Sequence, residues 1–590
     1  MCGFIGKISL DSLSHDELEE ENKYIICRGP DVTKTKEGIS GNYKYKLLFN
    51  RLSIIDLSSS ANQPIVSDQY NTILMFNGEI YNHNSLRTEL IKDNLEFKTD
   101  HSDSEVVLNG LSKYGSEYLS KLRGQFSIAF FNLKKNSVIL ARDRMGQKPL
   151  YYFSNKESLI FGSDFRSLRQ YLDEDSLDFE SIYTYLNFGS TAGGNTISKH
   201  IKKVLPSEFI EFKLSNTISK STSNYWNIKD HYDNKKFSNE EFFEIFSDSV
   251  SIRQEADVPI ANFLSGGIDS TSIIKNQYDN GLESNTFSVH INNEKYDESF
   301  WSNQVVQKYN TNHQFIEIDN KVNFESISDA LNSLDEPYSD PSVIPSYLIS
   351  NKISKHFKVA ISGDGGDELF GGYTRTINAL KPTNRMLNLI SSFYKIYPPQ
   401  LGTGSNFLRF SNNVEKKYNS YLEDKKLLQL LKIKDSTKLD YSNFENTYKS
   451  LLNVDYTFYL PDQMLFKVDR TSMANSIEVR SPFVDHLLVE YIFSHSTEYF
   501  DLNKQKKILK NYLSQDFDDK FLYRKKQGFV FDLENWVYGN LSIINEFVNG
   551  GEVVNNLNSK IVSNLSINKS RINALRIWRL FVLEYYLSKR

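Results

Sequence analysis

The sequence predicts two cored domains: packed sheets with few helices in the N-terminal part, and an α/β domain with a largely parallel sheet in the C-terminal part. Three observations carry this expectation. The chain has 590 residues, several times the usual domain size. Short β-type runs dominate up to about residue 214, and beyond residue 236 helix-period stretches alternate with short apolar strands.

The first domain is expected over residues 1–212. Its β-type runs are broken by Gly, Asn and Asp turns, as at 73–76, 126–131 and 137–141. One exception is the stretch 104–113, where apolar residues at helical spacing follow Ser102-Asp103-Ser104, a typical capped helix start. Few helices are therefore expected among the strands of this domain.

A linker is expected over 213–236, which is rich in Ser, Asn, Lys and Thr and has little periodic apolar signal. The second domain, 237–590, has strands predicted at 260–264, 286–289 and 358–361, separated by helical stretches. Such alternation favours parallel strands, and ligands of parallel sheets bind at the carboxyl ends of the strands. From about residue 380 the pattern is mostly helical.

The composition excludes several classes of function. Lys and Arg number 69 against 74 Asp and Glu, and the formal charge of −5 argues against a broad surface for nucleic acid. The two cysteines, Cys2 and Cys27, cannot build a disulfide framework, which favours a reducing compartment. No basic and apolar leader and no membrane-spanning apolar run are visible in the sequence. We expect a cytoplasmic protein without nucleic-acid or membrane partners.

Cys2 is the first candidate for chemistry because it follows the initiator methionine. Removal of that methionine would leave the Cys2 thiol beside a free α-amino group. An α-amine has a pKa near about 8, so part of it is unprotonated at neutral pH and can act as general base for the thiol. Alone, a cysteine at this position is more often a small apolar residue at a chain end. Other motifs must decide between the two interpretations.

Five short motifs follow one another along the first domain: Cys2-Gly3-Phe4-Ile5-Gly6, Arg28-Gly29-Pro30-Asp31, Arg51-Leu52-Ser53-Ile54, Phe76-Asn77-Gly78-Glu79-Ile80-Tyr81-Asn82 and Ser102-Asp103-Ser104-Glu105. Each is ordinary alone; Asn77-Gly78, for example, is typical of a hairpin turn. As an ordered set they resemble the glutaminase domain of the N-terminal-nucleophile amidotransferases, in the asparagine synthetase branch. The resemblance implies an α+β fold of stacked antiparallel sheets with helices. Cys27 stands where relatives often have His, and we interpret it as structural.

The resemblance assigns glutamine-binding roles that suit the chemistry of the side chains. Arg51 would bind the α-carboxylate of glutamine, and Asp103 its α-ammonium group. Glu79 would help to hold the amine. Attack of the Cys2 thiolate on the side-chain amide creates an oxyanion, which Asn77 and the backbone N–H of Gly78 would stabilise.

A second candidate site begins where the predicted strand 260–264 runs into Ser265-Gly266-Gly267-Ile268-Asp269-Ser270. The two glycines let the backbone approach an oligophosphate, and the following helix start offers unpaired N–H groups. This string resembles the PP-loop of enzymes that split ATP into AMP and pyrophosphate. The resemblance implies the following ATP-binding residues: Leu264, Ser265, Gly266, Gly267, Asp269, Ser270, Val289, Ser362, Gly363 and Lys526.

Further motifs extend this second resemblance. The strand 358–361 leads into a glycine-rich acidic loop, 362–373, where acidic and hydroxyl groups suit Mg²⁺, ribose or an acceptor amine. The resemblance implies Mg²⁺ ligands at Asp269 and Asp367, and a catalytic carboxylate at Asp364. Three stretches, Asp462-Gln463-Met464, Asp469-Arg470-Thr471-Ser472-Met473 and Glu478-Val479-Arg480-Ser481-Pro482-Phe483 with Asp485, match a helical signature of the asparagine synthetase domain. Lys526, in Arg524-Lys525-Lys526-Gln527-Gly528-Phe529, would face the triphosphate.

Matched motifs from Cys2 to Phe529 thus resemble the glutamine-hydrolysing asparagine synthetases over nearly the whole chain. The family implies a relay in which glutamine is hydrolysed at Cys2, a carboxylate is adenylated by MgATP, and ammonia attacks the acyl-AMP. A protected passage between the domains, lined by apolar residues, is expected because free ammonia would be protonated or lost in water. A PP-loop enzyme that modifies tRNA and a catalytically inactive binding protein are weaker alternatives.

The acceptor stays open at this point. Aspartate is favoured, but relatives that amidate carboxylates on sugars (uronic acids) for surface polysaccharides have similar sequences. Asp364 stands where the best-known asparagine synthetases have Glu, so the carboxylate is retained with a shorter reach. The sequence does not decide whether the chain forms a homodimer.

Overall fold

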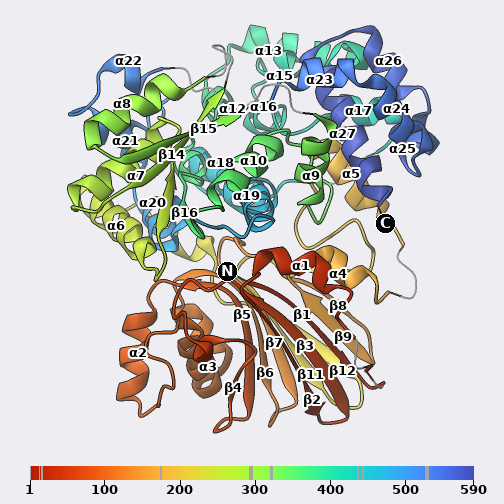
Figure 1. Cartoon of the computed structure of the whole chain (residues 1–590). Helices are drawn as coiled ribbons and strands as arrows, with labels where there is room; N and C mark the ends of the chain where they lie inside the picture. Colours follow the sequence, from red (N-terminus) through yellow and green to blue (C-terminus); the bar gives the residue numbers. More distant parts are fainter. Residues whose placement is uncertain are drawn as a thin grey trace.

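The computed structural model describes residues 2–11, 13–14, 17–172, 176–291, 297–318, 323–434, 438–441, 444–524 and 531–589. The chain forms two halves that lie against each other, with the sheets of the N-terminal half below and the mixed helical half above in Figure 1. The start of the first strand lies at the junction between these halves. The Cys2 end of the chain is therefore not out in solvent.

The N-terminal half contains two six-stranded antiparallel sheets, in the strand orders β10-β8-β9-β1-β3-β2 and β12-β11-β7-β6-β5-β4. The strands of the first sheet are β1 (Cys2–Ser9), β2 (Val32–Ser40), β3 (Tyr43–Arg51), β8 (Tyr151–Ser154), β9 (Ser158–Gly162) and β10 (Lys202–Lys203). Those of the second sheet are β4 (Ile65–Ser67), β5 (Thr72–Ile80), β6 (Gly124–Asn132), β7 (Ser137–Arg142), β11 (Glu208–Leu214) and β12 (Ile218–Asn224). The predicted strands at 73–76, 126–131 and 137–141 are confirmed.

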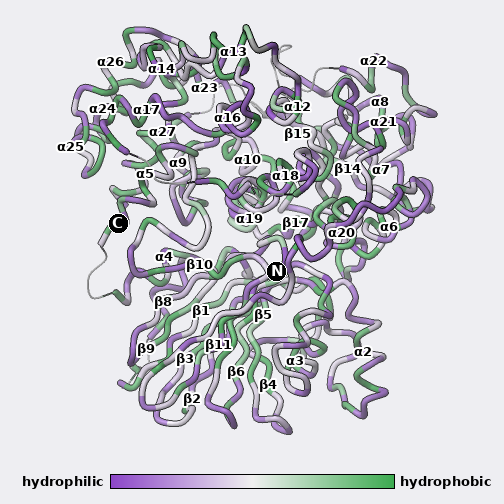
Figure 2. The backbone as a smooth tube through the Cα atoms, turned by 180° about the vertical axis from the view of Figure 1, so that it is seen from behind, coloured by the Kyte–Doolittle hydropathy of each residue, from purple (hydrophilic) through white to green (hydrophobic). Residues whose placement is uncertain are grey.

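The two sheets pack face to face and are covered by helices on their outer faces. Phe4, Phe49 and Phe161 of the first sheet share a buried core with Met75 and Phe131 of the second. Hydrophobic stretches run along β5 and β6 in Figure 2. The outer helices are α2 (His83–Lys92) and α3 (Asp103–Tyr114) on the second sheet, and α1 (Asn22–Ile25) and α4 (Phe165–Arg169) beside the first. The expected stacked antiparallel architecture is confirmed.

The C-terminal half is built on a five-stranded sheet in the order β15-β14-β13-β16-β17, and every pair in it is parallel. Its strands are β13 (Ile260–Phe263), β14 (Asn285–Ile291), β15 (Asn312–Ile318), β16 (Val359–Ile361) and β17 (Glu478–Arg480). Helices α6 (Asn239–Ser251), α7 (Ile268–Asp279), α8 (Ser299–Tyr309), α9 (Phe324–Asn332) and α10 (Val343–Ile353) belong to this half. The α/β expectation with a parallel sheet is confirmed.

The rest of the C-terminal half is helical, as the sequence predicts. These helices are α11 (Gly366–Phe370), α12 (Thr374–Leu380), α13 (Arg385–Ser391), α14 (Phe393–Ile396), α15 (Ser405–Leu408), α16 (Val414–Asn419), α17 (Lys425–Leu431), α18 (Thr447–Val454), α19 (Leu465–Met473), α20 (His486–Ser494), α21 (Lys507–Leu513), α22 (Asp519–Leu522), α23 (Leu533–Gly539), α24 (Leu541–Gly550), α25 (Val554–Asn558), α26 (Ile561–Ile567) and α27 (Arg571–Leu587). A π-helical stretch, Asp455–Met464, leads into α19.

The boundary between the halves is less simple than the sequence predicts. Residues 218–224, inside the range expected as a linker, form β12 and pair with β11 along their whole length. This strand is mostly exposed and polar, so it lacks the apolar alternation by which a strand is recognised. The helix α5 (Phe179–Phe188) lies within the range expected for the first domain, but it packs with α17 and α27 of the C-terminal half. The limits 1–212 and 237–590 therefore stay a proposal.

Two local predictions differ from the structure. Glu478–Arg480, expected within a helical signature, is the strand β17, because its backbone pairs with β16 at the edge of the parallel sheet. Ser102 precedes α3, but its side chain makes no capping hydrogen bond. In the part of the chain that the structure describes, no helix is both long and apolar enough to cross a membrane.

Candidate functional site

Cys2 opens β1 and lies opposite Arg51 of β3 in the sheet register. The residue is buried, and its backbone N–H donates to Asn77 Oδ1 at 2.9 Å. Burial raises the pKa of the Cys2 thiol. A thiol in this position needs a neighbouring proton acceptor before it can act as a nucleophile.

Asn77 and Gly78 lie within β5 and do not form a hairpin turn. Asn77 is opposite Ser127 of β6, and its Nδ2 donates to Ser127 Oγ at 3.3 Å. Gly78 has φ +156°, and a Cβ there would lie 2.0 Å from the carbonyl oxygen of Gln125. Only glycine fits this close approach of two strands. The residues predicted for the oxyanion site are thus held on a rigid strand beside Cys2.

Arg51 is buried at the end of β3, where it shapes the loop that follows. Its Nη1 donates to the Ser58 carbonyl oxygen and to Asn62 Oδ1, both at 2.8 Å, and its Nη2 donates to the Ile55 carbonyl oxygen at 3.2 Å. Because the guanidinium organises this loop next to Cys2, it is a fixed positive charge at the place where a glutamine carboxylate is expected.

Asp103 and Glu79 bring two carboxyl groups to the same buried region. Asp103 begins α3, and its Oδ2 accepts the backbone N–H of Ile80 at 3.1 Å. Glu79 lies 3.5 Å from Nη2 of Arg480, a residue of β17 in the other half of the molecule. Burial raises the pKa of both carboxyl groups, and the charge of Glu478 raises that of Glu79 further. The predicted amine-binding residues therefore lie together, and the C-terminal half contributes to their surroundings.

The predicted PP-loop follows β13 and leads into α7. Gly266 has φ +65°, and a Cβ there would lie 2.6 Å from the backbone nitrogen of Ser302, so the loop packs closely on the start of α8. The backbone N–H of Gly267 donates to Ser265 Oγ at 3.2 Å, and Ser270 Oγ donates to the Gly267 carbonyl oxygen at 3.2 Å. The backbone is thus folded into a compact turn at the N-terminus of α7, a suitable place for an anion.

The acidic loop after β16 packs directly on the PP-loop. A Cβ on Gly363 would lie 3.0 Å from Asp269 Cβ. Ser362 is buried, and its Oγ donates to Asp364 Oδ2 at 2.8 Å. The backbone N–H of Leu264 donates a hydrogen bond to the carbonyl oxygen of Phe287 on β14 at 2.8 Å. The predicted residues of the ATP site from these loops are therefore adjacent at the carboxyl ends of β13 and β16; Val289 lies on the neighbouring strand β14.

Lys506 joins the two loops. Its Nζ lies 2.5 Å from Asp269 Oδ2 and 2.5 Å from Asp367 Oδ1, so both carboxylates predicted as Mg²⁺ ligands meet at one cation. This arrangement fits a divalent ion that is shared with phosphate oxygens. Among the described residues, no group of three or more His, Cys, Asp or Glu side chains could hold a metal ion unaided.

Lys526 lies outside the described residues, so its predicted contact with the triphosphate stays a prediction. Arg524, just before it, is described: its Nη2 donates to the Gly266 carbonyl oxygen at 3.0 Å, and its Nη1 contacts Glu298 Oε1 at 2.7 Å. The first contact attaches Arg524 to the PP-loop, and the second attaches it to the residue before α8.

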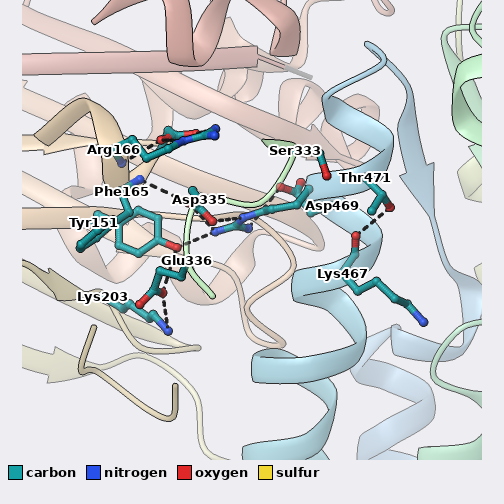
Figure 3. A network of polar contacts seen from close by, with 12 residues as sticks. Tyr151, Phe165, Arg166, Lys203, Ser333, Asp335, Glu336, Lys467, Asp469 and Thr471 are labelled. Carbon is teal, nitrogen blue, oxygen red and sulfur yellow. Dashed lines mark hydrogen bonds and ion pairs between the residues drawn. The ribbon is translucent and has the colours of Figure 1, made fainter. Parts of the chain in front are cut away.

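A buried ion pair connects the two halves close to Cys2. Arg28 donates to both carboxylate oxygens of Asp469 on α19, at 2.9 and 3.1 Å, and its Nε donates to the Cys2 carbonyl oxygen at 3.2 Å. Burial alone would raise the pKa of Asp469, but Arg28, Lys148 and Arg470 hold that pKa well below its usual range. Figure 3 shows Asp469 in the polar network that continues to Asp335 and Glu336. Such bidentate pairs fix orientation as well as charge.

A small cavity lies between the halves, with a volume of about 10 Å³, which is room for one water-sized molecule. Its lining comes from both halves: Gln125, Gln147, Lys148, Ser362, Asp364, Leu465, Val468, Asp469, Ser472, Val479 and Ser481. Asp364 belongs to the acidic loop, and Gln125 to the strand beside Gly78. Polar side chains share this lining with Leu465, Val468 and Val479, and a separate apolar cluster joins Leu52 and Ile54 to Val359 and Met473 across the halves. The apolar lining expected for a passage between the domains stays a prediction. The buried charges of Arg28 and Asp469 are tolerated there because the two side chains form an ion pair across the junction.

Comparison with known proteins agrees with this geometry. The family model for asparagine synthase matches residues 241–559, and the model for the glutamine amidotransferase domain matches residues 1–226. The chain belongs to the asparagine synthase family. It is a glutamine-dependent amidotransferase of the asparagine synthase type, and ATP use follows from this membership.

Three relatives illustrate the range of the family. Asparagine synthetase [glutamine-hydrolyzing] 1 of Bacillus subtilis is 29% identical, covering 91% of this chain and 88% of the relative. A putative asparagine synthetase [glutamine-hydrolyzing] 2 of Methanocaldococcus jannaschii is 30% identical, covering 80% and 98%. A Penicillium rubens protein named amidase chyE is 26% identical, covering 81% and 78%. These identities and coverages support membership of the asparagine synthase family.

Sequence reasoning missed several residues that shape the sites of this asparagine synthase-family chain. Lys506 has φ 54°, unusual for lysine, but a lysine before a helix carries no distinctive sequence signal. Arg28 and Arg480 lie inside motifs that were recognised, although their partners in the other half were not. Gln125 follows Gly124 in a β-type run, and only its burial beside the cavity draws attention to it.

Glu368 should make the free energy of unfolding of this chain depend on pH. It is buried in α11, Tyr373 donates to its Oε1 at 2.6 Å, and burial with the nearby charge of Asp367 raises the pKa of Glu368 to about 7. Between the unfolded and folded pKa values the native state binds more protons, so the free energy of unfolding falls as pH rises through 7. In Glu368→Gln, the decrease in the free energy of unfolding between low and high pH should be smaller by up to about 3 kcal/mol.

Thermal unfolding at pH 5.5 and pH 8 tests this expectation. The difference in unfolding temperature between the two pH values should be smaller in Glu368→Gln than in the wild type. Glu415→Gln, which changes an exposed carboxylate, is the control and should match the wild type. Equal pH dependence in all three proteins would contradict the assignment of this titration to Glu368.

Proposed function

We propose that this chain releases ammonia from glutamine at Cys2 and transfers it to a carboxylate that is activated by MgATP, with aspartate as the favoured acceptor. The observation that carries this proposal is the cavity between the halves: Gln125, next to the Cys2 region, and Asp364, next to the PP-loop, line the same small space. A cavity that is lined from both halves, beside two chemically different sites, favours transfer of a small intermediate over independent reactions.

In the glutaminase half, the Cys2 thiolate would attack the glutamine side-chain amide and form a thioester. The C–N bond then breaks, ammonia leaves, and water later cleaves the thioester to give glutamate. The α-amine exposed by removal of the initiator methionine would be the base for the thiol. Arg51, Asp103 and Glu79 would hold glutamine, and Asn77 with the Gly78 N–H would stabilise the oxyanion. The burial of these groups around Cys2 supports these roles.

In the C-terminal half, ATP would bind with its phosphates at the PP-loop and react with a carboxylate to give acyl-AMP and pyrophosphate. The contacts proposed with ATP are those of Leu264, Ser265, Gly266, Gly267, Asp269, Ser270, Val289, Ser362, Gly363 and Lys526. The compact turns of the two loops support the contacts that come from those loops. Asp269 and Asp367 would hold Mg²⁺, which when bound neutralises phosphate charge. Adenylation is required because oxide is a very poor leaving group and AMP is a good one.

Ammonia would then cross the cavity and attack the acyl-AMP. Asp364 lines this space and would accept a proton from the attacking nitrogen. Gln125 is fully buried, and within the described part of the chain neither its Nε2 nor its Oε1 has a hydrogen-bond partner. An unpartnered amide in the wall of a water-sized cavity offers both a donor and an acceptor to ammonia. We infer that Gln125 positions the intermediate during transfer.

Gln125→Leu should uncouple the two reactions. Loss of one hydrogen bond to ammonia in a buried space should raise the glutamate released per amide formed by about threefold or more. Reaction with added ammonia at saturating concentration should stay within about twofold of the wild type. Gln69→Leu, a change of an exposed glutamine, is the control. An unchanged ratio of glutamate to amide in Gln125→Leu, with normal unfolding temperature, would remove Gln125 from the proposal.

The acceptor is best tested directly. The purified chain with MgATP and glutamine is offered aspartate and, in a separate reaction, a nucleotide-linked uronic acid, while AMP and amide are measured. AMP formed with aspartate supports the favoured acceptor; AMP formed only with the uronic acid supports the alternative, amidation of a sugar carboxylate. Release of ADP in either reaction would contradict adenylation.

Two free cysteines agree with the predicted cytoplasmic location, which stays a prediction.

A further inference from the structure

An exposed apolar surface lies at the end of the C-terminal half that is opposite the sheets of the N-terminal half. Figures 1 and 2 both show α13 and α26 at this end. Met386 and Leu389 of α13 are 78% and 73% exposed, and Ile396 at the end of α14 is 74% exposed. The start of α27 adjoins them, because a Cβ on Gly402 would lie 3.5 Å from Ile572 Cδ1. We define the apolar end surface by the exposed side chains of Met386, Leu389, Phe393, Ile396, Leu401 and Ile572.

Contacts on the inner side hold this surface in place. Lys426 Nζ donates to the Tyr397 carbonyl oxygen at 2.8 Å, and Arg576 Nη1 donates to the Pro399 carbonyl oxygen at 2.7 Å. Neither α14 nor α15, which both lie in the described range 323–434, has a buried residue. Single exposed apolar side chains are ordinary, but a group of them that no core requires marks an interaction surface.

The charges at the apolar end surface are positive. Between residues 381 and 410 the sequence has four Lys or Arg residues and no Asp or Glu, although the whole chain has a charge of −5. Within the described part of the chain, the charged ends of Lys381, Lys395 and Arg571 take part in no hydrogen bond, ion pair or ring contact. Lys395 lies on α14 among the exposed apolar residues, and Arg571 directly precedes Ile572. Free cations therefore stand beside the apolar side chains.

The chemistry of the apolar end surface favours a lipid bilayer over a protein partner. A second copy of the chain on a twofold axis would place these same cations opposite each other. Side chains as exposed as Met386, Leu389 and Ile396 project from the surface, so they do not form the walls of a groove for a peptide. Anionic lipids offer dispersed negative headgroups directly above an apolar layer, which matches free cations beside projecting apolar side chains.

We propose that the apolar end surface docks on a membrane surface that contains anionic lipids. The exposed side chains of α13 and α14 would enter the boundary between headgroups and acyl chains, and Lys381, Lys395 and Arg571 would lie among the lipid phosphates. This contact is peripheral, so it requires neither a membrane-spanning run nor a leader, the two features on which the expectation of no membrane partner rested. No residue assigned to glutamine or ATP belongs to this surface, and docking should leave both reactions unchanged.

The test is sedimentation of the full chain with vesicles. One set contains phosphatidylcholine with about 30% phosphatidylserine, and the other contains phosphatidylcholine alone. We expect binding to the anionic vesicles to be at least about tenfold tighter than to the neutral ones, and to weaken by at least about tenfold in about 0.5 M NaCl, which screens the Lys and Arg charges. No binding to the anionic vesicles, or equal binding to both sets, would overturn the proposal.

Two variants localise the contact. Leu389→Ser combined with Ile396→Ser removes projecting apolar groups, and Lys395→Glu reverses a charge; each should weaken binding to the anionic vesicles by about tenfold or more. The matched controls lie on β2, in the other half: Ile39→Ser changes an apolar residue that is 65% exposed, and Lys34→Glu reverses an exposed charge. Both controls should bind as the wild type does. Wild-type affinity in both surface variants would place the contact elsewhere and contradict the proposal.

Other occupants of the surface give different results. A wild-type dimer in gel filtration that dissociates when Leu389→Ser and Ile396→Ser are combined, without vesicle binding, would assign the surface to a second copy. Binding of polyglutamate without vesicle binding would assign it to an acidic protein. Either result overturns the proposal. Because the substituted side chains are exposed, the variants should keep the unfolding temperature and glutamine hydrolysis of the wild type, so this result is separate from the test of the proposed function.

Discussion

Cys2→Ala should lower glutamine-dependent amide formation by at least about 10³-fold, because no other described residue at this site can form the thioester. Amide formation from added ammonia should stay within about twofold of the wild type, since the adenylating loops lie in the other half. The measurement is amide formed with glutamine and, separately, with ammonium chloride at a pH that supplies free ammonia.

The second cysteine supplies the matched control. Cys27 is half-buried, and its Sγ donates to the Tyr24 carbonyl oxygen at 3.9 Å, outside the group of residues around Cys2. Cys27→Ala should therefore keep glutamine-dependent activity. If Cys2→Ala retains glutamine-dependent turnover in the absence of ammonia, or if both activities fall together in a folded protein, the nucleophile assignment is wrong.

Lys506→Met should lower AMP formation by about 10²-fold or more, with glutamine hydrolysis kept. Lys506 is buried between Asp269 and Asp367, and its removal leaves two close carboxylates without their shared cation at the place where phosphate is expected. Like charges there repel each other and the triphosphate. The rate of AMP formation at varied MgATP concentration measures the loss.

Lys507→Met is the control for this experiment. Lys507 follows Lys506 in the chain, but its Nζ donates to the Glu498 carbonyl oxygen at 3.5 Å and not to the two carboxylates that Lys506 joins. This variant should form AMP at nearly the wild-type rate. Near-normal AMP formation by Lys506→Met would remove Lys506 from the phosphate site, and a large loss in both variants would indicate a general effect of charge.

The positions of several strands could be predicted from the sequence because they depend on local patterns of apolar and turn residues. The β-type runs at 126–131 and 137–141 became β6 and β7, and the motif around Asn77 lies where its ordered neighbours imply. The resemblance also named residues that the structure brings together around Cys2 and around the predicted PP-loop; their roles, and the position of Lys526, stay predictions.

Long-range partners could not be predicted in this way. Arg28 and Asp469 are 441 residues apart in sequence, and nothing local to either residue specifies their pairing. The same holds for Lys506, which is 237 residues from Asp269. The strand β12 was missed for a different reason, since an exposed edge strand with polar residues on both faces lacks the alternation that indicates a strand. Tertiary pairing decided its structure.

The packing of α5 affects how the two activities can be separated in the laboratory. Tyr185 of α5 donates to the Arg579 carbonyl oxygen on α27 at 2.8 Å, and Arg579 donates back to Leu186 at 2.9 Å. A fragment that stops at residue 212 would contain α5 but lack α17 and α27, so the apolar face of α5 would be exposed to water. Clipping the last helix from the full chain would uncover the same surface. Each half is thus completed by a piece of the other, and activity of isolated fragments would underestimate both.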